Sequence, residues 1–144
     1  YKPPAYWKCI AEIVDAINIP VVANGEIWNI RDWQQCKDES GCADFMVGRG
    51  LVACPDLALQ IKAHNEQSDY ESMVWSDILI LLNRFYYDTK DAYPLRFLGN
   101  RVKQWLFYLQ MHYPEAIPFF EKIKRYKQPH EFEAILGKKM ASDG

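Results

Sequence analysis

The first half of the chain alternates amphipathic segments with short, mostly apolar ones. In residues 7–17 the apolar side chains recur at steps of three and one, which predicts a helix with one buried face. Residues 19–23 and 43–47 are short runs that are apolar except for Asp44. Apolar runs of this length are typical of strands that are buried on both faces of a parallel sheet.

A polar helix is predicted between the two strands. Asn29 has the side chain of a helix N-cap, and the helix is expected to end near Gly41. Two parallel strands joined by a helix form a βαβ unit, but two strands cannot make a sheet alone. A (β/α)₈ barrel needs about 250 residues. If these are barrel strands, we expect the remaining strands upstream of Tyr1.

A domain boundary is predicted after the second strand. Residues 55–63 favour a further helix, and the polar stretch 64–71 is typical of a linker. We therefore divide the chain into residues 1–66 and residues 67–144.

The second domain shows only helical periodicity. Its predicted helices span residues 73–87, residues 95–111, a segment that begins at Pro114, and residues 130–136. Over 95–111 the apolar positions fall within an arc of roughly 100°. This pattern predicts a helical bundle.

Composition narrows the functional classes. The 144 residues hold 17 Lys and Arg against 19 Asp and Glu, and the net charge of −2 argues against a uniformly basic nucleic-acid binder, so a polyanion must meet a local patch. No apolar run approaches the roughly 18 residues of a membrane span. We expect a soluble, cytoplasmic protein without a membrane partner.

The cysteines do not predict a metal site. Cys9, Cys36, Cys42 and Cys54 contain no C-x-x-C pair, and the three histidines lie far from them in sequence. We expect reduced thiols, with Cys36 and Cys42 buried as small packing residues.

Two motifs follow the predicted strands. Asn24, Gly25 and Glu26 offer an amide, a flexible backbone and a carboxylate at a strand end, where parallel α/β proteins bind ligands; a simple turn is the alternative. Gly48 and Arg49 follow the second strand, where backbone N–H groups and a guanidinium suit a phosphate. The alternative there is a strand-to-helix turn with a solvated arginine.

A basic cluster lies near the carboxyl end of the chain. It contains Lys122, Lys124, Arg125 and Lys127, with Tyr126 interleaved as a candidate for stacking on a base. A solvated helix face is the alternative.

Together these motifs resemble a known family. Residues 18–28, Cys36, residues 40–44 and residues 47–50 resemble the carboxyl-terminal barrel half of the tRNA-dihydrouridine synthases. Residues 101–106, 108–109 and 113–116 are similar to the helical tRNA-binding domain of the bacterial C-type subfamily. The resemblance implies the last strands and helices of an FMN-binding (β/α)₈ TIM barrel followed by a helical bundle, an α/β plus all-α fold.

The resemblance also implies an activity. Members of the family are oxidoreductases that use FMN and NADPH to reduce a D-loop uridine of tRNA, here expected at position 16. The family's catalytic cysteine lies on the earlier half of the barrel, and none of the four cysteines of this chain stands in the matching motif. We therefore expect the chain alone to be inactive, and its unpaired barrel strands to favour self-association.

By resemblance, Asn24, Gly25 and Glu26 are FMN contacts, and Gly48 and Arg49 hold the FMN phosphate. The RNA-binding residues carried over are Arg101, Lys103, Tyr108 and Lys124. Helix geometry places Arg101 and Tyr108 on one face but Lys103 about 160° away. The family pattern has arginine at the position of Lys124, and a lysine lacks its bidentate fork.

Two alternatives to a synthase stay open at this point. One is a non-catalytic RNA-binding or interaction module, and the other is another FMN- or phosphate-binding barrel with an unrelated helical tail.

Overall fold

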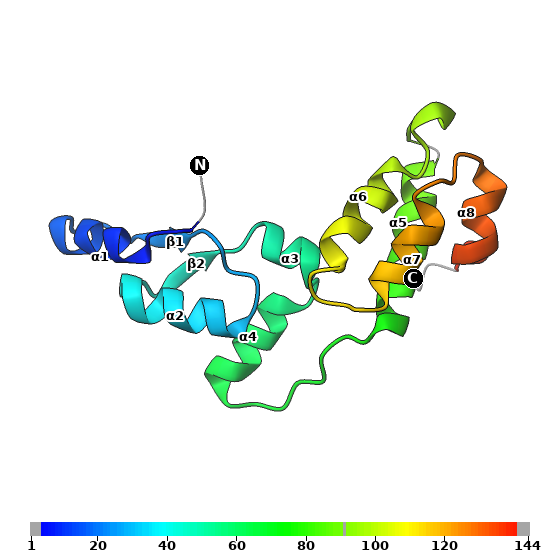
Figure 1. Ribbon diagram of the computed structural model, residues 1–144. Helices are drawn as coiled ribbons and strands as arrows, with labels where there is room; N and C mark the ends of the chain where they lie inside the picture. Colours follow the sequence, from blue (N-terminus) through cyan, green and yellow to red (C-terminus); the bar gives the residue numbers. More distant parts are fainter. Residues whose placement is uncertain (1–3, 91, 141–144) are drawn as a thin grey trace. The chain divides into compact units, whose positions relative to one another are not determined.

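The chain divides into two compact units, Tyr1–Ser72 and Met73–Gly144, each with its own hydrophobic core. A computed structural model describes residues 4–90 and 92–140 (Figure 1). Among these residues no helix combines the length and the apolar character that a membrane span requires.

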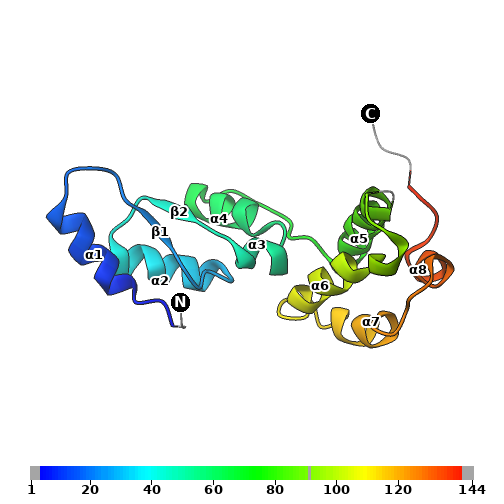
Figure 2. The ribbon, with the colours of Figure 1, turned by 90° about the horizontal axis from the view of Figure 1, so that it is seen from above.

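The first unit contains one pair of strands and four helices within its described part. In chain order the elements are α1 (Trp7–Ala16), β1 (Val22–Asn24), α2 (Ile30–Ser40), β2 (Asp44–Met46), α3 (Arg49–Ala53) and α4 (Leu57–Glu66). β1 and β2 are parallel, with Ala23 opposite Phe45, and they run side by side in both views (Figures 1 and 2). The predicted parallel pair with an intervening helix is confirmed. α3 was not predicted.

The predicted N-cap of α2 and its predicted end near Gly41 are confirmed. The Asn29 Oδ1 accepts the backbone N–H of Asp32 at 3.0 Å. At the other end Gly41 has φ 69°, and its N–H donates to the carbonyl of Lys37 at 3.0 Å. The caps fix both ends of the helix. They therefore also fix where the loop from β1 enters α2 and where the chain leaves α2 towards β2.

The strand pair is covered on one face. Ala23 is fully buried in a core with Trp33 and Cys36. Val22 and Met46, whose side chains point to the other face, are 54% and 56% exposed. The prediction of strands buried on both faces is therefore wrong for the described chain, because its helices cover one face only. The predicted burial of Cys36, together with that of Cys42, is confirmed.

α4 is longer than predicted. The sequence suggested a helix to residue 63, but the helix continues to Glu66 and ends at Gln67, whose φ is 53°. A run of exposed polar side chains does not stop a helix, whereas a residue in the left-handed region does. The first three residues of the predicted linker are thus helical.

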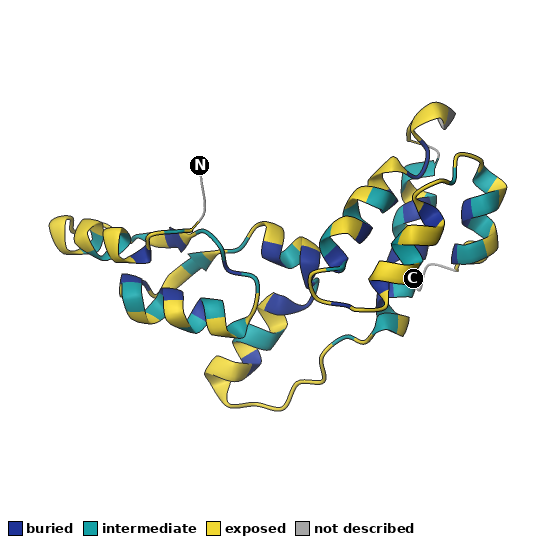
Figure 3. Ribbon diagram, in the orientation of Figure 1, coloured by how far each residue is buried: buried dark blue, intermediate teal, exposed yellow. Residues whose placement is uncertain are grey.

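The segment between α4 and α5 is tied to the first unit. It is exposed along most of its length (Figure 3), but the Tyr70 hydroxyl donates to the Asp56 Oδ2 at 3.3 Å. Asp56 is buried, and its other oxygen lies 3.4 Å from the Cys54 Sγ. The chain therefore leaves the first unit after Tyr70.

The second unit is helical throughout its described part. Its elements are α5 (Trp75–Lys90), the 3₁₀ turn η1 (Leu95–Phe97), α6 (Asn100–Leu109), α7 (Ala116–Ile123) and α8 (Pro129–Leu136). Large side chains from α5, α6, α7 and α8 fill its core, including Ile78, Leu82, Tyr86, Val102, Leu106, Ile123 and Phe132. The buried positions gather on the inner sides of these helices (Figure 3).

A glycine interrupts the helix that the sequence predicted over residues 95–111. Gly99 has φ 75° and separates η1 from α6, so the prediction of one continuous helix is wrong. A Cβ on Gly99 would collide with the ring of Phe132, which is fully buried and stacked on Tyr86 at 5.6 Å between centroids. The chain turns here to let α8 approach.

A buried amide fastens the end of α8 to α5. The Asn83 Nδ2 donates to the carbonyls of Leu136 at 2.8 Å and Lys138 at 3.0 Å. Its Oδ1 accepts the N–H of Met140 at 3.3 Å. One side chain thereby holds the segment that follows α8.

Candidate cofactor and RNA sites

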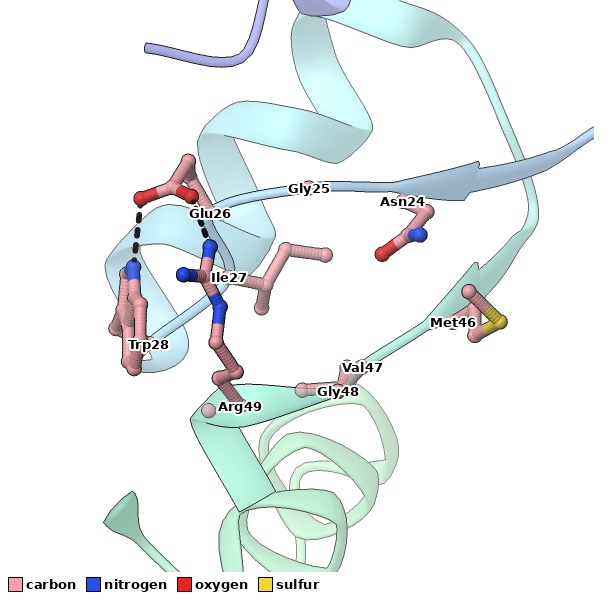
Figure 4. A pocket seen from close by; sticks show the side chains of 10 residues that line it. Asn24, Gly25, Glu26, Ile27, Trp28, Met46, Val47, Gly48 and Arg49 are labelled. Carbon is pink, nitrogen blue, oxygen red and sulfur yellow. Dashed lines mark hydrogen bonds and ion pairs between the residues drawn. The ribbon is translucent and has the colours of Figure 1, made fainter. Parts of the chain in front are cut away.

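A hollow of about 390 Å³ lies at the carboxyl ends of β1 and β2 (Figure 4). It is lined by Asn24, Gly25, Glu26, Ile27, Trp28, Met46, Val47, Gly48, Arg49 and Gly50. We call it the strand-end hollow. All five residues predicted from the two motifs line it, so the structure brings together side chains that are 23 positions apart.

The backbone after β1 is shaped for this site. Gly25 has φ 119°, and Glu26 has φ 53°, which is uncommon for a residue with a side chain. The Trp7 indole N–H, on α1, donates to the carbonyl of Gly25 at 2.9 Å and so holds the turn after β1 in place. Backbone strain of this kind persists where surrounding contacts hold it, as they do at binding sites.

Glu26 is held by two partners. Its Oε1 is 2.8 Å from the Arg49 Nη2, and its Oε2 accepts the Trp28 indole N–H at 3.0 Å. The Arg49 guanidinium also lies 5.3 Å from the centre of the Trp28 ring. Figure 4 shows the carboxylate of Glu26 reaching both partners.

Trp28 is a site residue for which the sequence analysis had no role. It is half-buried, lines the strand-end hollow, and donates its backbone N–H to the Asp32 Oδ2 at 2.9 Å. Trp28 follows Glu26 by two positions, outside any helical or strand periodicity. Only its place inside the family motif signalled it.

The two glycines around Arg49 serve different purposes. A Cβ on Gly50 would collide with the carbonyl oxygen of Ile27, so Gly50 is required for close packing of α3 against the loop after β1. A Cβ on Gly48 would meet nothing within 4 Å, and Gly48 is exposed at the hollow. Gly48 therefore leaves room for a group to approach the backbone.

The chemistry of the hollow suits an anion with polar surroundings. A guanidinium carries five N–H donors, and the side chain of Arg49 is 54% exposed despite its pairing with Glu26. Asn24 adds an exposed amide. Within the ranges that the structure covers, no three His, Cys, Asp or Glu side chains converge as metal ligands.

Three of the four predicted RNA-binding residues lie at the surface of the helical unit. Arg101 is exposed on α6, 3.2 Å from the Gln104 Oε1 and over the ring of Tyr93. Tyr108 is half-buried near the end of the same helix. Lys124 directly follows α7, is exposed, and pairs with Glu121.

Lys103 differs from the other three. Its ammonium donates to the carbonyl of Tyr126 at 2.6 Å and lies 5.5 Å from the Phe132 ring centre. Burial lowers the pKa of Lys103 below its ordinary value. Tyr126, the aromatic residue of the basic cluster, packs edge-on against Phe132. Lys103 therefore joins α6 to the chain after α7.

The basic cluster itself is solvated. Its members Lys122, Lys124, Arg125 and Lys127 are all exposed. Four cations over such a short segment form a local positive patch on a chain whose net charge is −2.

Comparisons with known proteins cover nearly the whole chain. The sequence model of the family described as "Dihydrouridine synthase (Dus)" matches residues 1–142. A tRNA-dihydrouridine(16) synthase of Pseudomonas putida is 43% identical over 137 residues, which cover 95% of this chain and 42% of that protein. The proteins of the same name from Pseudomonas syringae pv. tomato and Ralstonia nicotianae are 41% and 38% identical, over 95% and 100% of this chain and 43% and 44% of their own lengths.

The chain thus spans less than half the length of the curated relatives it matches. The family match covers the helical unit as well as the strand pair, which contradicts the alternative of a barrel with an unrelated helical tail. On this evidence the chain belongs to the dihydrouridine synthase family.

Proposed function

We propose that this chain supplies the FMN phosphate site and the tRNA-binding domain of a tRNA-dihydrouridine synthase that reduces uridine 16 of tRNA with NADPH. The observation that carries the proposal is the strand-end hollow, where Asn24, Gly25, Glu26, Gly48 and Arg49 meet. The names of the relatives support the tRNA substrate and the position. We further propose that β1 and β2 are the last two strands of a (β/α)₈ barrel, because they are parallel and carry the ligand residues at their carboxyl ends.

The residues of the hollow fit the phosphate end of FMN. The half-exposed Arg49 provides charge-assisted donors, and Gly48 leaves space beside its backbone. The volume of about 390 Å³ lies within the range of about 300–1,000 Å³ that ligand pockets occupy. Asn24, Gly25 and Glu26 form the opposite wall and are the contacts we assign to the rest of the cofactor.

Bound and reduced, FMN supplies the hydride for uracil C6. The residues of this chain bind and orient: Arg49 neutralises the phosphate, and Glu26 holds Arg49. The proton for uracil C5 needs a general acid. We place that acid in the earlier half of the barrel, because none of Cys9, Cys36, Cys42 and Cys54 stands in the family's cysteine motif.

The helical unit, within residues 67–144, is the part that we assign to tRNA. Arg101 and Lys124 present cations to phosphates, and Tyr108 presents an aromatic ring. Lys103 contributes by fixing the backbone at Tyr126, beside the basic cluster. A separate domain is useful because the target base must leave its stack to be reduced.

Product analysis tests the proposal. The full-length enzyme that contains this chain is incubated with unmodified tRNA and NADPH, and dihydrouridine is mapped by mass spectrometry. We expect dihydrouridine at position 16, and none in a control tRNA with cytidine there. Modification elsewhere, or none by an enzyme that retains FMN, would refute it. Turnover by the 144-residue chain alone would contradict our placement of the acid.

A further inference from the structure

Trp28 is in contact with both charged residues of the strand-end hollow. Its indole N–H donates to the Glu26 Oε2 at 3.0 Å, and its ring centre lies 5.3 Å from the Arg49 guanidinium. Glu26 and Arg49 also pair with each other at 2.8 Å. The three side chains therefore form a closed triangle in which each member touches the other two (Figure 4).

The backbone at Trp28 is held by neighbouring elements. Its backbone N–H donates to Asp32, which lies in the first turn of α2. The residue before it, Ile27, is buried, and its carbonyl oxygen lies against Gly50 on α3. The indole is thus attached to the rigid part of the unit on both sides of the hollow.

Arg49 needs such a support. Its side chain is 54% exposed, and an exposed ion pair alone holds a long side chain weakly, because water and salt compete for both charges. An aromatic ring against one face of the guanidinium restricts the group further. The carboxylate at its edge and the ring at its face together define one orientation.

We propose that Trp28 is a positioning residue that orients Arg49 for the phosphate of FMN, directly through its ring and indirectly through Glu26. This inference rests on the proposed function, because it takes Arg49 as the phosphate ligand. Removal of the indole leaves Arg49 its charge but frees its orientation. The loss should therefore weaken the part of cofactor binding that depends on the phosphate more than the rest.

Riboflavin, which lacks the phosphate, separates this part from the rest. The full-length apoenzyme is titrated with FMN and with riboflavin, and binding is followed by flavin fluorescence. For Trp28→Ala we expect the FMN affinity to fall by about 3- to 10-fold more than the riboflavin affinity. Trp28→Phe keeps a ring and loses the N–H, so its effect should be smaller.

Three further variants make the outcome decisive. Arg49→Ala is the reference and should reduce the preference for FMN over riboflavin more than Trp28→Ala does. The double variant should be no worse than Arg49→Ala, because Trp28 acts through Arg49. Trp75→Phe, in the helical unit, is the tryptophan control and should leave both affinities unchanged.

The results distinguish the phosphate-binding role of Arg49 from the positioning role of Trp28. If Arg49→Ala leaves the preference unchanged, the phosphate assignment of the proposed function is wrong. If Arg49→Ala reduces the preference but both Trp28 variants keep it, the positioning role of Trp28 is wrong. An equal loss of FMN and riboflavin in both Trp28 variants would also overturn that role, since it would mean a general distortion of the hollow.

Discussion

Replacement of Gly99 by alanine tests the packing that shapes the helical unit. Gly99 is buried at the junction of η1 and α6 with φ 75°, and an added Cβ would meet the ring of Phe132. The substitution therefore introduces two independent costs. One is a backbone conformation that residues with a Cβ disfavour, and the other is a steric conflict in a filled core.

The two costs can be estimated separately. The left-handed conformation costs a residue other than glycine about 1–2 kcal/mol, and overpacking a core costs about 1–3 kcal/mol. Phe132 has little freedom to move, because it stacks on Tyr86 and packs edge-on against Tyr126. We expect Gly99→Ala to lower the free energy of unfolding by about 2–5 kcal/mol, a large share of the stability of a domain.

Gly41→Ala is the matched control. Gly41 also has a left-handed φ, of 69°, but a Cβ there would meet nothing within 4 Å. This variant should cost only the backbone term, about 1–2 kcal/mol. The difference between the two variants measures the conflict with Phe132.

The assay combines denaturant unfolding with amide hydrogen exchange of the full-length protein. In Gly99→Ala we expect faster exchange in α6 and α8, with the strand pair unaffected. Adding Phe132→Leu should relieve the conflict, so the double variant should be more stable than the sum of the single effects predicts. Strict additivity, or a Gly99→Ala variant no less stable than Gly41→Ala, would refute the reasoning.

Three further predictions concern RNA binding, pH and association. Arg101→Ala and Lys124→Ala should each weaken tRNA binding and reduce its salt dependence by about one counterion, with the flavin spectrum intact; wild-type binding at every salt concentration would contradict the assignment. Burial, then the charges of Glu133 and Tyr87, raise the pKa of Tyr86 to about 12. Because the folded pKa lies above the ordinary value near 10, the stabilisation is complete below pH 10 and is lost as the pH rises towards 12. Unfolding measurements should show a loss of about 1 kcal/mol at pH 11 that Tyr86→Phe lacks. In the described chain β1 and β2 each have an unpaired edge, so this chain alone should form dimers or larger assemblies in light scattering at micromolar concentration; a stable monomer would argue against the exposed edges as a cause.

The sequence predicted those features that depend on local pattern. The short apolar runs located β1 and β2, and Asn29 and Gly41 located the ends of α2, because strand burial and helix caps are encoded within a few residues. The proposed ligand residues Gly25 and Gly48 were located in the same way. Each lies within two positions of the end of an apolar run, where a parallel sheet binds its ligands.

The sequence could not predict features that depend on contacts between distant segments. The apolar positions of residues 95–111 fit one helix, and only Phe132, more than thirty positions away, explains why the chain turns at Gly99. Lys103 was predicted to be a surface cation that binds RNA. Its partner is the backbone carbonyl of Tyr126, and a backbone group gives no signal in the amino-acid sequence. The role of Trp28 depends on Arg49 and on the positive φ of Glu26, which pattern analysis does not detect.

The hydrogen bond between Tyr70 and Asp56 also sets the length of the tether between the two units. Without it, the eight residues 67–74 separate α4 from α5; with it, the connecting segment is shortened to residues 71–74. A flexible chain spans about 5–6 Å times the square root of its length, so the mean reach falls from about 16 Å to about 11 Å. The effective concentration of one unit near the other scales with the −3/2 power of tether length and is raised about threefold. Under the proposed function, a single phenol thus influences how often a tRNA bound by the helical unit meets the proposed flavin site, although Tyr70 does not line the strand-end hollow.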